Sequence, residues 1–254
     1  MDATVVFFHA HPDDEAIFTG GTMALLAQSD VRVVLVTATR GERGISRFAL
    51  PAGEQVADRR EAETRRAAAV FGAVETVFLG WEDSGMLGDP GNDAPGVFWR
   101  APVDQAAAAL AAVCSRYEAR ALVTYDPNGI YGHPDHVQVH RVGAAAAILA
   151  GVEAVYETTV DHEYLHFVDT HLVEGVVAPV TRAERARIGL PTAAITTSID
   201  VRSALASKRA AMAAHASQIP ETDLGAPEGA FADVYGWEWF VRRGPRSVLE
   251  SALL

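Results

Sequence analysis

Short apolar runs alternate with longer amphipathic segments along the first 150 residues of the chain. The apolar runs, such as TVVFF at residues 4–8, are continuous, which is typical of strands buried on both faces of a parallel sheet. The longer segments are rich in good helix formers such as alanine. The pattern predicts strands at residues 4–8, 31–37, 75–79 and 121–125, and helices at residues 16–28, 56–71, 103–117 and 134–150.

This alternation predicts an α/β fold, with a Rossmann-like, doubly wound, mostly parallel sheet and helices on both faces. Two long loops, at residues 39–55 and 80–101, interrupt the pattern, and loops of this length are usually functional or disordered. After Gly151 the pattern weakens to short strand-like pieces, a helix near residues 202–215 and a final strand near residues 239–242. We expect one domain over residues 1–254, with residues 151–254 as its more variable part.

Composition narrows the classes of partner. With 21 basic and 33 acidic residues the formal net charge is −12, which disfavours nucleic acid as the main partner. The single cysteine, Cys114, excludes an intramolecular disulfide and fits a reducing cytoplasm. The sequence shows no basic leader and no apolar run of the roughly 20 residues that would span a membrane. We therefore expect a cytoplasmic protein with neither nucleic acid nor membrane as partner, and leave a homo-oligomer open.

Ligand-type side chains gather directly after the first predicted strand, in the segment HAHPDDE at residues 9–15. His11 and Asp14 are three positions apart, and on a turn that opens a helix this spacing can aim both side chains at one point. Imidazole and carboxylate are good zinc ligands. Asp13, beside them, could take a proton from a metal-activated water. The alternative is a plain acidic helix N-terminus that complements the helix dipole.

A second polar segment, GHPDH at residues 132–136, follows the fourth predicted strand. A catalytic zinc needs three protein ligands, and we predict His136 as the third. His133 could donate a hydrogen bond to the oxyanion of a tetrahedral intermediate, and Tyr131 could donate another. Asp135 could orient a histidine ligand. The alternative is a capped helix with surface histidines. Since ligands bind beyond the carboxyl ends of strands in such sheets, the two segments together favour a catalytic site.

These two segments resemble the LmbE-like, or PIG-L, superfamily of zinc-dependent de-N-acetylases. The resemblance rests on AHPDDE at residues 10–15 and HPDH at residues 133–136, and TYDPNG with YGHPDH across residues 124–136 resembles the subgroup that deacetylates N-acetylglucosaminyl-inositol in mycothiol biosynthesis. WEDSGM at residues 81–86 and Arg60 are similar to the same subgroup, whereas Ile130 stands where the subgroup has glycine. Lys208, His215 and Gln218 resemble a superfamily pattern in the penultimate helix.

The resemblance implies a Rossmann-like fold and hydrolysis of the N-acetyl group of a small N-acetylglucosamine-type conjugate. It implies Zn²⁺ bound by His11, Asp14 and His136, although other divalent transition metals accept the same ligands. Asp13 would be the base, and His133 would stabilise the oxyanion or serve as the acid, with Tyr131 and Asp135 assisting. Arg60 and Asp83 would contact sugar hydroxyls, although without the resemblance both residues read as ordinary surface or turn positions. Residues 151–254 would shape the substrate mouth.

Three rival functions remain at this point. The chain could be an amidase that cleaves a mycothiol S-conjugate, or a deacetylase of an antibiotic pathway. It could also be a non-catalytic sugar-binding Rossmann-like module. Nucleotide binding is disfavoured, because the first strand is not followed by the glycine-rich G-x-G-x-x-G turn.

Overall fold

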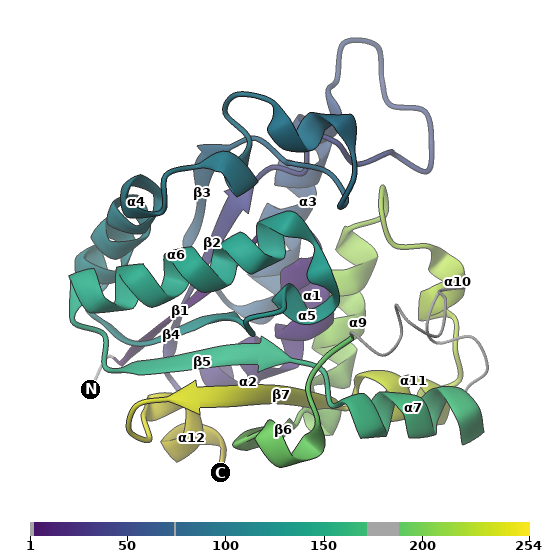
Figure 1. Ribbon diagram of the computed structural model, residues 1–254. Coiled ribbons are helices and arrows are strands. Elements are labelled where there is room, and N and C mark those ends of the chain that lie inside the picture. The colour runs from purple at the N-terminus through teal and green to yellow at the C-terminus, as the bar shows by residue number, and fades with distance from the viewer. Residues whose placement is uncertain (1–2, 74, 172–187) are drawn as a thin grey trace.

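A seven-stranded, mostly parallel sheet forms the centre of the computed structural model, which describes residues 3–73, 75–171 and 188–254. The strands lie in the order β3-β2-β1-β4-β5-β7-β6 (Figure 1). The first five are parallel, and β7 runs antiparallel to both β5 and β6. Their bounds are β1 Thr4–His9, β2 Arg32–Thr39, β3 Glu75–Trp81, β4 Ala119–Tyr125, β5 Ala154–Thr159, β6 Thr197–Asp200 and β7 Trp237–Arg243.

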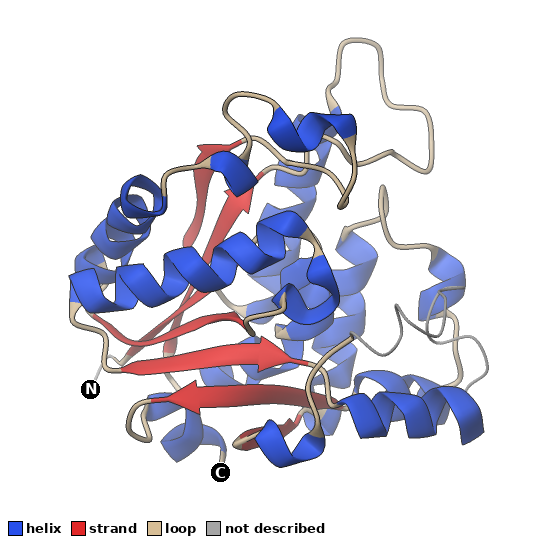
Figure 2. Cartoon of the chain, viewed as in Figure 1, coloured by secondary structure: helices blue, strands red, loops and turns tan. Residues whose placement is uncertain are grey.

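Helices cover both faces of this sheet (Figure 2). The described helices are α1 Asp14–Phe18, α2 Gly20–Gln28, α3 Val56–Phe71, α4 Val103–Arg116, α5 Gly129–Gly132, α6 Pro134–Ala150, α7 His162–His171, α9 Leu205–Ala214, α10 Glu221–Leu224, α11 Glu228–Tyr235 and α12 Val248–Leu253. None of the helices in the described ranges is both long and apolar enough to cross a bilayer. The predicted fold class is confirmed.

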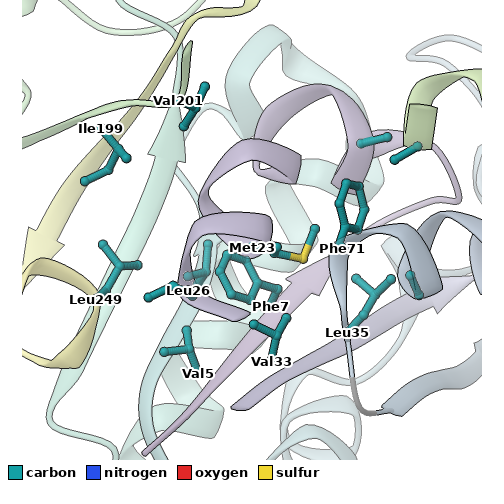
Figure 3. Packing of buried hydrophobic residues seen from close by; sticks show 14 of the residues in the cluster. Val5, Phe7, Met23, Leu26, Val33, Leu35, Phe71, Ile199, Val201 and Leu249 are labelled. Atoms are coloured by element: carbon teal, nitrogen blue, oxygen red, sulfur yellow. The ribbon is translucent and has the colours of Figure 1, made fainter. Parts of the chain in front are cut away.

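The strands bury side chains on both faces because they are apolar at successive positions. In β1, Val5 and Phe7 belong to one core cluster, whereas Val6 and Phe8 belong to the other. The first cluster packs against α2, α3, α9 and α12, through residues that include Met23, Leu26, Phe71, Met212 and Leu249 (Figure 3). The second cluster packs against α4 and α6, through residues that include Leu110, Cys114, Val139 and Val142.

The strand order reverses between β1 and β4. After β1 the chain continues to β2 and β3 on one side, and it later returns to β4 and β5 on the other side. Adjacent parallel strands with this reversal leave a crevice at their carboxyl ends, where ligands bind in such folds. Both polar segments singled out in the sequence begin at these two strand ends.

Two local expectations are wrong. The helix expected over residues 16–28 is divided at Thr19 into α1 and α2. The two glycines that follow serve close packing, since a Cβ atom on Gly21 would lie 2.4 Å from the Cβ atom of Val201. The segment after Gly151, expected to hold short strand-like pieces, supplies strands β5 and β6 but also the helix His162–His171.

Candidate functional site

Strand β1 passes into α1 through a sharp bend at Asp13. This residue has a φ angle of 97°, in the region that side chains other than glycine rarely adopt. Its carbonyl accepts hydrogen bonds from the backbone N–H groups of Ala16 and Ile17, which begins the helix. Its own N–H donates to Glu15 Oε2 at 2.9 Å. The bend therefore brings the segment from His11 to Asp14 together at the sheet edge.

The loop after β4 is organised around the buried carboxylate of Asp126. One of its oxygens accepts from the backbone N–H groups of Asn128 and Ile130, and the other accepts from Thr159 Oγ1 at 2.6 Å. Ile130 has a φ angle of 64°, which explains why glycine suits this position. The loop ends at His133, whose Nδ1 accepts from the backbone N–H of Asp135 and so caps α6.

Asp14 lies between His11 and His136 where these two loops come together. Asp14 Oδ2 lies 3.4 Å from His11 Nδ1 and 3.3 Å from His136 Nε2. Two ligands bonded to one tetrahedral zinc ion at about 2.1 Å lie about 3.4 Å apart. All three side chains are buried. The donor types and their spacing therefore suit a transition metal, with a carboxylate oxygen between two imidazole nitrogens.

His133 is a second candidate for a ligand, because its ring also lies within this cluster. Ligand atoms of His11, His133 and His136 lie within 4.8 Å of one another. However, the ion pairs of Asp14 among the described residues run to His11 and His136. In addition, His133 Nδ1 already accepts the capping hydrogen bond. The contacts of Asp14 therefore favour His136, whereas the spacing of the ligand atoms also admits His133.

The ring of His11 is fixed from its other side. Its Nε2 lies 3.1 Å from Asp135 Oδ2 and 3.5 Å from Asp83 Oδ1. Asp135 is held in turn by Ser84, whose backbone N–H donates to Asp135 Oδ2 at 2.9 Å and whose hydroxyl donates to Asp135 Oδ1. When Nε2 of His11 carries the proton and donates it to Asp135, the lone pair of His11 Nδ1 faces Asp14.

Charges within the cluster perturb its titration. Burial alone would lower the pKa of His11, but hydrogen bonds to Asp135 and Asp14 raise that pKa well above its ordinary value. Burial alone would raise the pKa of Asp14, but the facing His136 and His11 hold that pKa well below its usual range. His11 and Asp14 together therefore favour a positive charge between them. A metal ion would compete with a proton for the lone pairs of the His11 imidazole and the Asp14 carboxylate.

His133 is neutral in this environment. Burial, reinforced by the neighbouring His11 and His136, lowers the pKa of His133 to about 3. Because Nδ1 accepts a hydrogen bond, the single proton of the neutral ring sits on Nε2. His133 is thus set up as a hydrogen-bond donor.

Asp13 is held beside the cluster by Arg60. The buried guanidinium donates to the carbonyl of Pro12 at 2.6 Å, to the carbonyl of Gly41 at 3.1 Å and to Asp13 Oδ2 at 3.2 Å. Burial raises the pKa of Asp13 to about 6, with the positive charge of Arg60 opposing the rise. A carboxylate with such a pKa is suited to accept a proton near neutral pH.

Tyr131 lies at the open side of the cluster. Its hydroxyl is 3.4 Å from His136 Nε2, and 38% of its surface is exposed. Burial of the hydroxyl end, with the negative charge of Asp14 nearby, raises the pKa of Tyr131 well above its ordinary value. The hydroxyl therefore stays protonated and can donate a hydrogen bond.

Comparison with known proteins places the chain among the relatives that its motifs suggest. Residues 6–148 match the PIG-L family, described as GlcNAc-PI de-N-acetylase. The chain belongs to the PIG-L family. It is 37% identical to the 1D-myo-inositol 2-acetamido-2-deoxy-alpha-D-glucopyranoside deacetylase of Thermobispora bispora, over 96% of this chain and 91% of that protein. The resemblance noted in the sequence is confirmed.

Solved structures share the fold of this PIG-L protein at lower identity. The N,N'-diacetylchitobiose deacetylase of Pyrococcus horikoshii is 17% identical with a TM-score of 0.60, over 95% of this chain and 84% of that chain. GalB, the 4-carboxy-2-hydroxymuconate hydratase of Pseudomonas putida, is 20% identical with a TM-score of 0.62, over 96% and 97%. Because a hydratase shares the fold, the reaction has to be argued from the site.

The structure of the PIG-L protein brings all the predicted site residues to one region but places two of them unexpectedly. Arg60 faces Asp13 and two backbone carbonyls, so the solvated helix face considered for it is wrong. Asp83 is buried, accepts from the N–H of Gly85 and lies near His11. Sequence reasoning missed Ser84, which follows Asp83 in the WEDSGM segment and holds Asp135. It also gave no role to Glu15, the last residue of AHPDDE.

Proposed function

We propose that this protein hydrolyses the N-acetyl group of a small N-acetylglucosamine-type conjugate in a metal-dependent reaction. The observation that carries the proposal is the Asp14 carboxylate, set 3.4 Å and 3.3 Å from ring nitrogens of His11 and His136, with Asp13 directly beside it. The names of the relatives supply the substrate class. The 1D-myo-inositol glycoside of 2-acetamido-2-deoxy-glucose is the first conjugate to test.

The metal would be held by His11 Nδ1, Asp14 Oδ2 and His136 Nε2. Zinc suits this set of two imidazoles and one carboxylate, and iron, nickel and cobalt accept the same donors. When bound, a metal of this kind supplies Lewis-acid activation of water and of the acetyl carbonyl. Asp135, supported by Ser84, keeps the ring of His11 in the orientation that such binding needs.

The side chains around this point divide the proton transfers between them. Asp13 accepts a proton from the water whose oxygen forms the new bond to the acetyl carbon. His133 Nε2–H and the hydroxyl of Tyr131 donate hydrogen bonds to the carbonyl oxygen as it gains negative charge. The carbon–nitrogen bond then breaks, and Asp13 returns its proton to the leaving amine. Because Nδ1 of His133 accepts the N–H of Asp135, its Nε2–H is the group offered to the oxyanion, and the proposal assigns the return of the proton to Asp13.

A cavity of about 740 Å³ beside Tyr131 is the proposed substrate mouth. Its lining comes from four parts of the chain, namely the loop after β3, the loop after β4, the first turn of α6 and residues 189–191. It includes Met86, Leu87, Pro127, Asn128, Val137, Leu190 and Pro191. We propose that residues 151–254 belong to the same domain and help to select the aglycone there. For Arg60 and Asp83 we keep the prediction that they contact the sugar.

Acetate release from a panel of N-acetylglucosamine conjugates tests the function. The panel holds the sugar constant and varies the aglycone, with inositol, a second sugar and an apolar group as members, and an S-conjugate amide tests the amidase alternative. We expect release to require stoichiometric metal, to stop after chelation and to return when zinc is added. Release of acetate from none of the conjugates by metal-loaded protein would contradict the proposal, and a protein that purifies without stoichiometric metal would favour a binding module.

A further inference from the structure

Glu15 and His215 form a buried pair directly behind the site. Both side chains are fully buried, and His215 Nε2 lies 2.5 Å from Glu15 Oε1. The two residues are 200 positions apart in the sequence. His215 ends α9, whereas Glu15 stands in the first turn of α1. Neither side chain takes part in the proposed proton transfers.

The second oxygen of Glu15 links this pair to Asp13. Glu15 Oε2 accepts the backbone N–H of Asp13 at 2.9 Å. The carboxylate therefore bridges the imidazole of His215 and the residue with the φ angle of 97°. A backbone conformation of this kind costs roughly 1–3 kcal/mol and persists only where the surroundings hold it.

The position of His215 is itself fixed from α3. The buried carboxylate of Glu63 accepts hydrogen bonds from both the backbone N–H and the hydroxyl of Ser217, two residues after His215. The carbonyl of His215 accepts from the N–H groups of Gln218 and Ile219. His215 therefore sits in a well-anchored turn and can hold Glu15 in one orientation.

We propose that Glu15 and His215 are positioning residues for Asp13. The pair holds the backbone bend at Asp13, and with it the direction of the Asp13 carboxylate that takes the proton. Arg60 holds the side chain of Asp13, whereas Glu15 holds its main chain. This inference rests on the proposed function, in which Asp13 is the base.

A buried ion pair on the same helix offers a matched control. Lys208 Nζ donates to Glu238 Oε1 at 2.6 Å, and Glu238 also accepts from the backbone N–H groups of Gly21 and Thr22. This pair supports α2 in the way that His215 supports α1, and both its side chains are 1% exposed. Lys208→Met leaves a buried carboxylate without its cation, as His215→Leu does. Among the described residues, the polar contacts of this pair run to Gly21 and Thr22 and not to Asp13.

The test is a double-mutant cycle between His215→Leu and Asp13→Ala, with acetate release and bound metal measured for each protein. We expect His215→Leu to keep its metal and its KM within about twofold and to lose about tenfold or more in kcat. In the Asp13→Ala background, His215→Leu should lower kcat by less than about twofold, because His215 affects the rate by positioning Asp13. His215→Gln, which keeps an N–H donor, should recover part of the rate, and Lys208→Met should keep kcat within about twofold.

An activity-independent measurement accompanies the cycle. In the metal-loaded wild type the Asp13 amide should exchange slowly with solvent, and in His215→Leu its exchange should be accelerated about tenfold or more, with no such change in Lys208→Met. Unchanged exchange of this amide, or a His215→Leu loss that is equally large with and without Asp13, would overturn the positioning role. An equal loss of kcat in Lys208→Met would overturn it too.

Failure of the proposed function has a different signature. If the wild type releases no acetate from any conjugate, or if Asp13→Ala keeps the full rate, then the reaction or the base is wrong. The exchange of the Asp13 amide still decides whether His215 and Glu15 hold the bend.

Discussion

Replacing Asp13 by asparagine is expected to stabilise the metal-free protein while it abolishes most of the activity. Asparagine tolerates a positive φ angle, so the bend is kept and the negative charge alone is removed. Burial raises the pKa of Asp13 from 3.8 to about 6 despite the neighbouring Arg60. Folding of the metal-free protein therefore favours the protonated carboxyl group over the carboxylate.

The size and the sign of the expected change in stability follow from this shift in the pKa of Asp13. A rise of about two pKa units corresponds to about 3 kcal/mol, and since the Asp13 side chain is 19% exposed we expect about 2 kcal/mol. For a carboxyl group whose pKa is raised by folding, the cost is absent below the unfolded value of 3.8 and fully present above about 6. Asp13→Asn should therefore raise the free energy of unfolding of the metal-free protein only slightly at pH 4, and by the whole amount at pH 8.

Chemical denaturation of the metal-free wild type and Asp13→Asn at pH 4 and pH 8 measures the difference. Acetate release by the metal-loaded proteins should fall by at least about 100-fold in the variant, the usual contribution of a general base. If the variant were less stable than the wild type at pH 8, or if the two pH values gave the same difference, the electrostatic reasoning would be refuted. Full activity in the variant would refute the base assignment instead.

Two further substitutions test the metal centre and the packing beneath it. His136→Ala should leave the protein folded but lower bound metal well below one equivalent after dialysis, measured by elemental analysis, and a retained equivalent would indicate that His133 is the third ligand. Gly21→Ala should lower the free energy of unfolding by about 1–3 kcal/mol, because the new Cβ would lie 2.4 Å from the Cβ of Val201. An unchanged melting temperature for Gly21→Ala would mean that α2 can move away from Val201 without loss.

The central strands could be predicted because their environment simplifies the pattern. Strands β1 and β2 are buried on both faces, so each holds an unbroken run of four apolar residues that identifies it. Gly20 and Gly21 mark a weak point in the expected helix, but the packing of Gly21 against Val201 joins distant parts of the chain and could not be predicted from the local pattern. The helix His162–His171 was missed because its histidine and aromatic residues were read as strand-like.

The candidate site likewise contains residues that the sequence predicts and residues that it does not. His11, Asp14 and His136 could be picked out because each follows a predicted strand, and the strand ends meet in any doubly wound sheet. The residues that hold these three side chains in place could not be predicted from the sequence. Ser84 reads as an ordinary loop residue until Asp135 is found beside it. His215 gains its meaning only from a contact across 200 positions of sequence.

The contact between His215 and Glu15 limits how such enzymes can be recombined. The predicted ligands and Asp13 all lie in the segment matched by the family, residues 6–148, whereas His215 lies beyond it. On the proposed role of residues 151–254, a chimera that takes the first segment from one relative and the remainder from another would acquire a new substrate mouth. With His215 in the proposed positioning role, the chimera would work well only if the incoming segment also returns a histidine to Glu15.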